Sequence, residues 1–249
     1  MDDEGQINEI IEGAKAVQEA AKATGKVVDG LGDAGKFLGR VFGPLVVNGV
    51  GIIADRVKFY RIEQAIKLSE KTKKILKDRG IEDQTRSVHP KIAIPLIENA
   101  TLEDNETLHS LWAQLLANAM DPNYKHDITP MHVSIMKELQ PNDVIILSTI
   151  LQFIKKADRF NFIYHFKLTR SHVTHLVRKF KNIELSNKDV DLSFLNLERL
   201  SIIKKVTGEI HLEKTVEAIY DMIKREEYLL TAFGISLLRA TFINSNEFT

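Results

Sequence analysis

The residues with the clearest capacity for chemistry are two histidines three positions apart, His172 and His175, within RSHVTHLVRKFKN. On a helix this spacing places both imidazoles on one face, where they could share a metal ion. No carboxylate stands three or four residues from either, so the pattern offers no third ligand. We therefore interpret both histidines as facing solvent or phosphate, and we predict no metal site.

Other motifs that carry chemistry are weak or absent from the sequence. Gly30, Gly32 and Gly35 form a GxGxxG, but the preceding KVVD does not read as a strand and no alternating strand-helix units follow. The acids at 103–106 cluster at a predicted helix start, where they complement the helix dipole. The sequence has no GK[ST] loop, HExxH, GxSxG or cysteine. We therefore expect no enzyme, no catalytic residue and no cofactor.

The elements that carry these residues read as helices almost throughout. Residues 7–26 are alanine-rich and helical, and between Asp104 and Asp121 apolar residues including Trp112 follow helical spacing. Asp104 or Asn105 caps that helix, and Thr129-Pro130 predicts another that runs through Leu139. The run after Pro141 is apolar almost all round, which predicts a central buried helix.

The pattern changes after Arg159. Residues 160–168 alternate in polarity like an extended segment, and Thr169 caps a helix with an apolar face. A further helix is expected from about Asp191, then a turn at 207–209 between short β-prone runs, a helical stretch over 213–227, and a last helix after 228–234. Helices followed by a small hairpin are the parts of a winged helix, although the 213–227 helix would be an unusual elaboration of its wing.

Glycines concentrate at the N-terminal end. Ten of the thirteen lie within the first 51 residues, and three of them recur every fourth residue. On a helix these three form one smooth stripe that permits close backbone approach. Each glycine costs a helix about 1 kcal/mol relative to alanine, so close packing or lipid has to compensate. We predict a membrane or assembly element made of Gly35, Gly39, Phe42, Gly43, Leu45, Val46, Val47, Gly49, Ile52 and Ile53.

The apolar run is too short for a simple membrane span. Val41 to Ala54 would extend about 21 Å as a helix, against roughly 30 Å of hydrocarbon. A re-entrant hairpin, an interfacial helix and a buried core helix all fit this length. Residues 56–79 then hold nine Lys or Arg against three acids, which matches the flank of an anionic-membrane anchor. A solvated basic helix after a glycine-rich hairpin packed on the body, and self-association alone, remain open alternatives.

Composition is that of an intracellular protein. Bases and acids balance at 34 each, and the acidic start MDDEGQ is followed by no apolar signal region. We expect a cytoplasmic protein that is peripheral at the inner membrane. The charge is uneven, because residues 155–181 hold eight bases and one acid. The helix after Thr169 thus offers an alternative nucleic-acid face, formed by Arg170, His172, His175, Arg178, Lys179 and Lys181.

Longer stretches of the chain resemble a known family. The segment HPKIAIPLIENATLEDNETLHSLWAQLLANAMDP, followed by His132 and LQPND, is similar to the core of the abortive-infection alpha family of bacterial proteins. The later LERLSII and YLLTAFG stretches resemble its C-terminal portion, and the whole resemblance covers about residues 57–240. It implies a role in phage defence and carries no catalytic motif. The glycine-rich element lies outside it.

We therefore predict a mostly α protein in three parts. These are a glycine- and alanine-rich helical segment (1–56), a multi-helix domain (57–158) and a winged-helix-like domain with a small β-hairpin (159–249). Its predicted function is non-enzymatic abortive infection through the glycine-rich segment; the alternative is a winged-helix protein that binds nucleic acid as a regulator or sensor. Expected partners are further copies in a homo-oligomer, the anionic inner membrane, a phage or host protein trigger and, in the alternative, nucleic acid.

Overall fold

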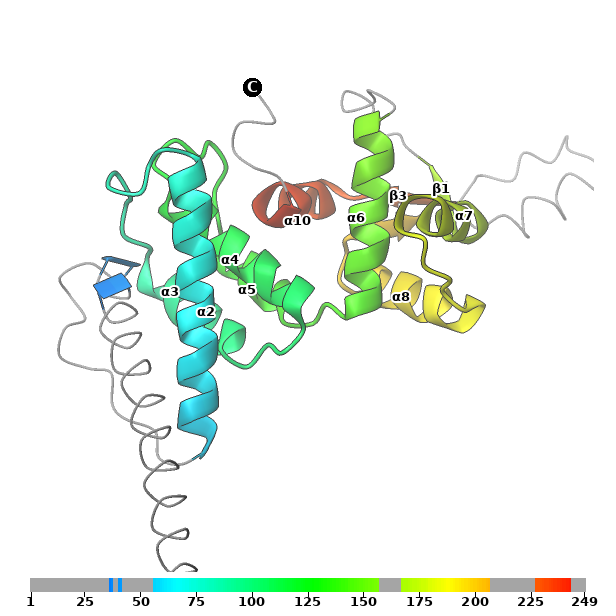
Figure 1. Cartoon of the computed structure of the whole chain (residues 1–249). Coiled ribbons are helices and arrows are strands. Elements are labelled where there is room, and N and C mark those ends of the chain that lie inside the picture. The colour runs from blue at the N-terminus through cyan, green and yellow to red at the C-terminus, as the bar shows by residue number, and fades with distance from the viewer. Residues whose placement is uncertain (1–35, 38–39, 42–55, 157–166, 207–226, 243–249) are drawn as a thin grey trace, which may run out of the picture.

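The structure, a computed structural model, describes residues 36–37, 40–41, 56–156, 167–206 and 227–242. Within these ranges the chain forms eight helices and one small antiparallel sheet (Figure 1). The helices are α2 (Arg56–Asp78), α3 (Pro90–Ala100), α4 (Glu106–Met120), α5 (Pro130–Met136), α6 (Pro141–Lys156), α7 (Arg170–Lys181), α8 (Asn187–Arg199) and α10 (Ala232–Phe242). The strands are β1 (Leu168–Thr169), β2 (Ile203–Lys205) and β3 (Glu227–Leu230). The predicted mostly helical fold with a small sheet is thus confirmed.

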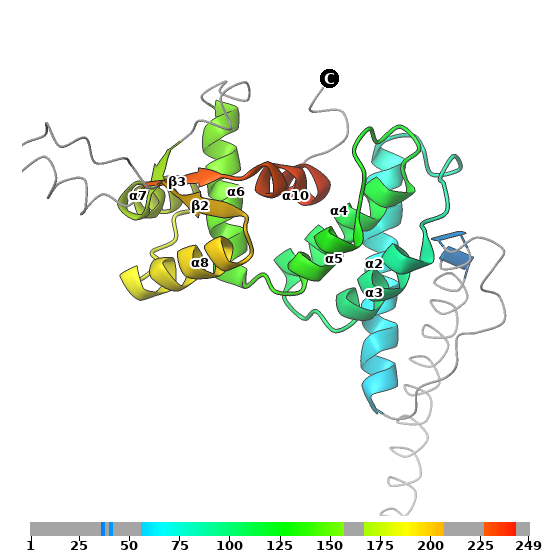
Figure 2. The same ribbon diagram turned by 180° about the vertical axis from the view of Figure 1, so that it is seen from behind.

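Helix α4 is the centre of a helical body formed by α2 to α5 and α10. Helices α2, α3 and α10 pack against α4, and α5 packs against α3 (Figures 1 and 2). Trp112 is buried in this core, as its helical spacing predicts. The helix begins where the Asn105 side chain accepts the backbone N–H groups of Thr107 and Leu108, both at 3.1 Å.

Two residues upstream of α2 also belong to the core of the helical body. Phe37 and Val41 are only 1% and 0% exposed, and the backbone N–H of Val88 donates to the Val41 carbonyl at 2.7 Å. Residues four apart lie on one face of a helix. The chain therefore contacts the helical body at Phe37 and Val41.

The remaining elements form a sheet module made of α6, α7, α8 and the three strands. Strand β3 is central in the order β1-β3-β2, and both pairings are antiparallel. Leu168 pairs with Tyr228, and Ile203 pairs with Leu230. The buried helix α6 packs against both α7 and α8, and it also contacts α4. The predicted domain boundaries remain predictions.

Helix α10 returns from the sheet to the helical body. It follows β3 after a single residue, Thr231, whose hydroxyl donates to the Ser201 carbonyl at 2.6 Å and accepts the Gly234 N–H at 2.9 Å. At Gly234 a Cβ atom would collide with the carbonyl oxygen of Ile202. The absence of a side chain at this position lets α10 begin beside β2 and then pack against α4.

Several local predictions need correction. The helix from Pro130 ends at Met136 rather than Leu139, and α8 begins at Asn187, four residues before the predicted Asp191. That earlier start follows from Ser186, whose hydroxyl accepts the Asp189 N–H at 3.1 Å. Glu227, predicted helical, instead pairs with Thr169 in the sheet. The predictions for residues 7–26, 160–166 and 207–226 lie outside the described residues.

Among the described helices, none is both long and apolar enough to cross a membrane.

Candidate functional site

The predicted membrane or assembly element lies outside the described residues. This holds for every member, namely Gly35, Gly39, Phe42, Gly43, Leu45, Val46, Val47, Gly49, Ile52 and Ile53. Its role therefore stays a prediction, and only the neighbours Phe37 and Val41 show where this part of the chain meets the core.

The predicted nucleic-acid face on α7 is split by the fold. Arg170 turns inward, where it donates to the Tyr228 hydroxyl at 2.7 Å and pairs with Asp191 at 3.2 Å. Arg178 pairs with Glu184 at 3.5 Å in an exposed ion pair. Arg170 is thus engaged by Tyr228 and Asp191 while its side chain stays 31% exposed. His175, Lys179 and Lys181 are exposed on it.

The two histidines of α7 have separate surroundings. The ring of His172 meets the Phe153 ring edge-on, with centroids 5.6 Å apart, whereas His175 is exposed. No group of three His, Cys, Asp or Glu side chains suited to a metal occurs in the part of the chain that the structure describes.

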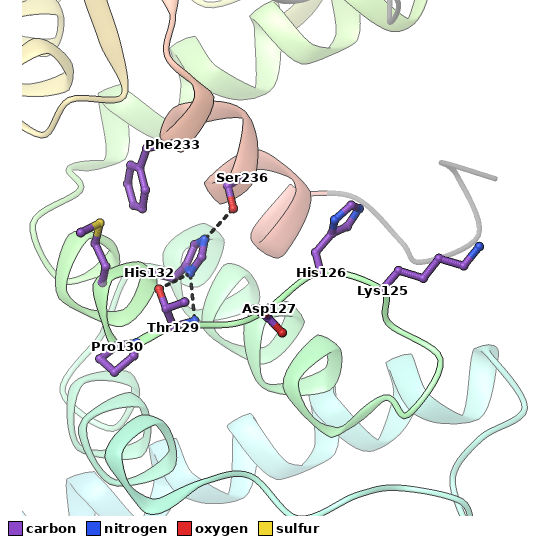
Figure 3. A pocket seen from close by; sticks show the side chains of 9 residues that line it. Lys125, His126, Asp127, Thr129, Pro130, His132, Phe233 and Ser236 are labelled. Carbon is purple, nitrogen blue, oxygen red and sulfur yellow. Dashed lines mark hydrogen bonds between the residues drawn. The ribbon is translucent and has the colours of Figure 1, made fainter.

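A different site, which we name the α5–α10 groove, lies within the helical body, between α5 and α10 (Figure 3). It has a volume of about 690 Å³, between the loop before α5, the start of α5 and the first turns of α10. Its lining residues are Lys125, His126, Asp127, Thr129, Pro130, Met131, His132, Phe233 and Ser236. The cap-then-proline signal at Thr129-Pro130 starts α5 at this point.

His132 links the two sides of the groove. Its Nδ1 accepts the backbone N–H of Thr129 at 3.0 Å, and its Nε2 lies 3.0 Å from the Ser236 hydroxyl oxygen. Because Nδ1 is an acceptor, the imidazole proton sits on Nε2 and is donated to Ser236. The Ser236 hydroxyl therefore accepts from His132 and keeps its own proton for another acceptor.

This geometry does not make Ser236 a nucleophile. A histidine that activates a serine accepts the serine proton at one nitrogen and is oriented through the other. Here Nε2 is already protonated, and Nδ1 faces a backbone N–H instead of a carboxylate. Burial lowers the pKa of His132, which keeps the ring neutral. The Thr129 hydroxyl oxygen also lies 2.9 Å from Nδ1, so both contacts of this nitrogen are with Thr129.

One wall of the groove is apolar. The Phe233 ring lies 5.4 Å from the His132 ring between centroids, at an interplanar angle of 30° (Figure 3). Pro130 and Met131 continue this wall, and Met131 is exposed although it is a large apolar side chain. Exposed methionine and aromatic side chains in a concave site are typical of ligand contacts.

The rim of the groove carries charged and titratable side chains from the loop before α5. Burial is the main cause that lowers the pKa of His126, and repulsion from Arg239 and Lys125 adds to it. Asp127 acts in the opposite direction. The Tyr124 ring meets the His126 ring edge-on at 5.6 Å, which helps to orient the imidazole. The rim of the groove therefore brings together one cation, one imidazole and one carboxylate, from Lys125, His126 and Asp127.

A buried polar network in the helical body was not predicted from the sequence. Arg79 donates to Asp121 at 3.0 Å and to the Asn118 side-chain oxygen at 2.8 Å, and Asn118 donates to the Ala240 carbonyl at 2.8 Å. These contacts join α2, α4 and α10. Asn118 lies within the otherwise apolar stretch LWAQLLANAMD, and Asp121 ends it. A polar residue on a helix that is buried at neighbouring positions could have indicated the network.

Comparison with known proteins identifies the family of this chain. The abortive infection alpha family model matches residues 63–241, which is most of the chain, so the protein belongs to that family. The matched range contains most of the helical body, the sheet module and the groove. The family indicates a role in abortive infection, a defence against phage. No curated protein and no solved structure matches the chain.

Proposed function

We propose that this protein performs abortive infection without enzymatic chemistry, through its glycine-rich apolar segment acting at the inner membrane or in self-assembly. The observation that carries the proposal is the burial of Phe37 and Val41 in the helical body. A helix that keeps about 100° per residue would turn Gly35, Gly39 and Gly43 to the face opposite these two anchors. The glycine stripe would then be available to a second copy or to lipid.

The basic residues of the stretch 56–79 support this proposal, but fewer of them are available to lipid than the sequence predicted. Arg79 is committed to Asp121 inside the body, and Lys71 pairs with Glu106 at 2.6 Å. Lys74 and Lys77 are exposed on α2, and Lys73 is half-buried. We expect these three lysines to supply the attraction to anionic lipid. In this proposal the body stays cytoplasmic and the oligomer forms through the glycine stripe.

The tautomer of His132 supports the non-enzymatic part of the proposal. Within the groove, His132 Nε2 donates to the Ser236 hydroxyl, whereas a catalytic histidine accepts the proton of its serine. We infer that the groove binds rather than reacts.

We also propose that the sheet module is a winged helix. The order α6-β1-α7-α8-β2-β3 and the sheet order β1-β3-β2 support this interpretation. Helix α8 then takes the position of the recognition helix. Leu192 and Leu195 on its outer side are 54% and 57% exposed, which suits a protein partner such as a phage or host trigger better than nucleic acid.

Nucleic-acid binding through α7 stays the alternative function, favoured by the exposed residues His175, Lys179 and Lys181. Changing Lys179 and Lys181 to Ala should weaken DNA or RNA binding and flatten its salt dependence by about 0.9 per lost duplex-phosphate contact. Loss of phage defence together with this binding, in a folded variant, would favour the alternative.

The proposal is tested by expressing the full chain and a chain without residues 1–56 in a bacterial host while membrane potential is recorded. We expect growth arrest and a changed potential only with the full chain. Retention of both effects by the shorter chain would contradict the proposal. As a second readout, Lys73→Glu, Lys74→Glu and Lys77→Glu together should reduce binding of the full chain to anionic vesicles, whereas Lys204→Glu on β2 should not.

A further inference from the structure

One half of the α5–α10 groove combines a hydroxyl group with aromatic surface. Figure 3 shows Phe233, Ser236 and His132 together in this half, whereas Lys125 points away from the contact between His132 and Ser236. The His132 Nε2 atom lies 3.0 Å from the Ser236 hydroxyl oxygen, and the His132 and Phe233 rings lie 5.4 Å apart between centroids. A hydroxyl and an aromatic ring are therefore within reach of a single small molecule.

The half-buried Ser236 hydroxyl is oriented to donate a hydrogen bond into the groove. His132 Nδ1 accepts the Thr129 N–H, which leaves Nε2 as the atom that donates to Ser236. His132 is only 3% exposed, and it is the one hydrogen-bond partner of Ser236 in the described part of the chain. The hydrogen of the serine hydroxyl is thus left for an acceptor from outside the chain, such as a carbonyl oxygen.

The apolar surface of this half suits a planar group. Phe233 is half-buried and Met131 is 57% exposed, so both side chains offer surface to a ligand. Aromatic rings pack favourably in offset or tilted pairs, and a methionine sulfur adds a favourable contact with a ring. Phe233 and His132 already pack in this way, at an interplanar angle of 30°. A flat aromatic ring should therefore bind here more tightly than a saturated ring of similar size.

The charges of the lining favour neither an anion nor a cation. Lys125 and Asp127 supply one positive and one negative charge. Burial lowers the pKa of His132, so this ring adds no charge at neutral pH. A charged ligand would lose part of its hydration without a net opposite charge to replace it, which is costly. An uncharged ligand avoids that cost.

We propose that the α5–α10 groove binds a small uncharged aromatic molecule that carries a carbonyl group. The carbonyl oxygen accepts the hydrogen of the Ser236 hydroxyl, and the aromatic ring lies against Phe233 and Met131. The ligand then contacts α5 and α10 at once, beside the hydrogen bond through which His132 joins them. This inference rests on the proposed function only in that the groove binds rather than reacts, and it is independent of the glycine-rich segment.

The test uses acetophenone, an aromatic ketone, as the probe and follows its binding to the full chain by NMR chemical shifts. Each comparison compound changes one property of the probe: acetone lacks the ring, cyclohexyl methyl ketone lacks planarity, and benzoate and benzylammonium carry a charge. We expect acetophenone to shift the amide signals of Thr129, His132 and Ser236. It should bind at least about fivefold more tightly than each comparison compound.

Variants separate the hydroxyl from the apolar surface. Ser236→Ala removes the donor and should weaken acetophenone binding by about three- to tenfold, as expected for one hydrogen bond between uncharged groups. Its matched control is Ser148→Ala, which changes another half-buried helix serine, on α6, and should leave the affinity unchanged. Met131→Ala, at an exposed position, should weaken binding by about two- to fivefold. It keeps the proposal testable if thermal denaturation shows that Ser236→Ala does not fold.

Three outcomes would overturn the inference. These are no shift of the groove signals by acetophenone at millimolar concentration, binding of benzoate or benzylammonium as tight as that of acetophenone, and parent affinity in Met131→Ala or in a folded Ser236→Ala. Each would leave the proposed function standing, because growth arrest through residues 1–56 needs no ligand in the groove. Conversely, growth arrest by the chain without residues 1–56 would contradict the proposed function and leave acetophenone binding unaffected.

Discussion

One ion pair of the helical body and one of the sheet module lie in opposite environments. In the body, Arg79 and Asp121 are almost fully removed from water, with side chains 6% and 2% exposed. In the module, Arg178 and Glu184 meet at the surface, 74% and 78% exposed. The buried pair also donates into a network that reaches α10, whereas the exposed pair joins α7 only to the segment after it. A guanidinium and a carboxylate thus form a buried pair that joins α2 to the end of α4 in the body, and an exposed pair that joins α7 only to the segment after it in the module. Removing one partner should therefore be costly in the body and nearly neutral in the module.

The largest expected effect comes from breaking the buried pair. Asp121→Ala leaves the Arg79 guanidinium buried without its carboxylate, which should cost about 3–5 kcal/mol of the free energy of unfolding. The matched change in the module, Glu184→Ala, should cost only about 0–1 kcal/mol. Chemical denaturation of both variants measures the difference. Equal losses would show that burial does not distinguish the two pairs.

The junction between the two regions should be the next most sensitive point. Gly234→Ala forces a methyl group onto the carbonyl oxygen of Ile202, and we expect a loss of about 1–3 kcal/mol in the free energy of unfolding. Gly80 is the control, because a Cβ there meets nothing within 4 Å and its φ of +70° is one that asparagine tolerates. A Gly234→Ala variant as stable as Gly80→Asn would contradict the close approach of α10 to β2.

A pH effect should arise in the body. Burial lowers the pKa of both His109 and His132, so the unfolded chain binds more protons than the folded chain once the pH falls below about 6.5. The sign is therefore a stability that is complete above pH 6.5 and is lost as the pH falls below it. His109 Nε2 meets the Gln64 carbonyl at 3.2 Å, and its buried Nδ1 has no partner for a second proton.

The measurement is the melting temperature between about pH 8 and pH 5 for the parent, His109→Gln and His132→Gln. Each variant should be less stable at pH 8 but should lose less stability on acidification. His175→Gln, at an exposed position in the module, should follow the parent curve. A parent whose melting temperature does not fall toward pH 5 would contradict this account.

The smallest stability effect should come from the outer face of α8. Leu192→Ser and Leu195→Ser remove side chains that are already more than half exposed, so each should change the free energy of unfolding by only about 0.5 kcal/mol. Leu197→Ser, on the buried face of the same helix, should cost several times more. Equal losses in the free energy of unfolding for Leu195→Ser and Leu197→Ser would contradict the exposure of Leu195.

The sequence predicted elements better than it predicted sites, for a physical reason. Helix caps and buried helical positions depend on residues close in the chain, so capping chemistry and periodicity predict them. Examples are the caps Asn105 and Thr169 and the buried Trp112. The Arg79–Asp121 pair joins residues 42 apart, and His132–Ser236 joins residues 104 apart. Such contacts depend on how helices pack, which a single sequence does not reveal.

The inward turn of Arg170 has the same origin. Helical spacing put it on a basic face, but β1 ends immediately before it and brings it to Tyr228 on the neighbouring strand β3. The sequence pattern of α7 contains no information about that strand pairing. The membrane or assembly element is different again, because its prediction depends on composition alone and remains a prediction.

The most direct test of the central claim compares phage survival and membrane potential in cells that carry the parent, Gly39→Ala or Gly39→Leu. The account predicts that leucine, which adds a large side chain where the stripe would touch a partner, abolishes both protection and the change in potential, while alanine reduces them less. Full protection by a folded Gly39→Leu variant, with the same change in potential as the parent, would contradict it.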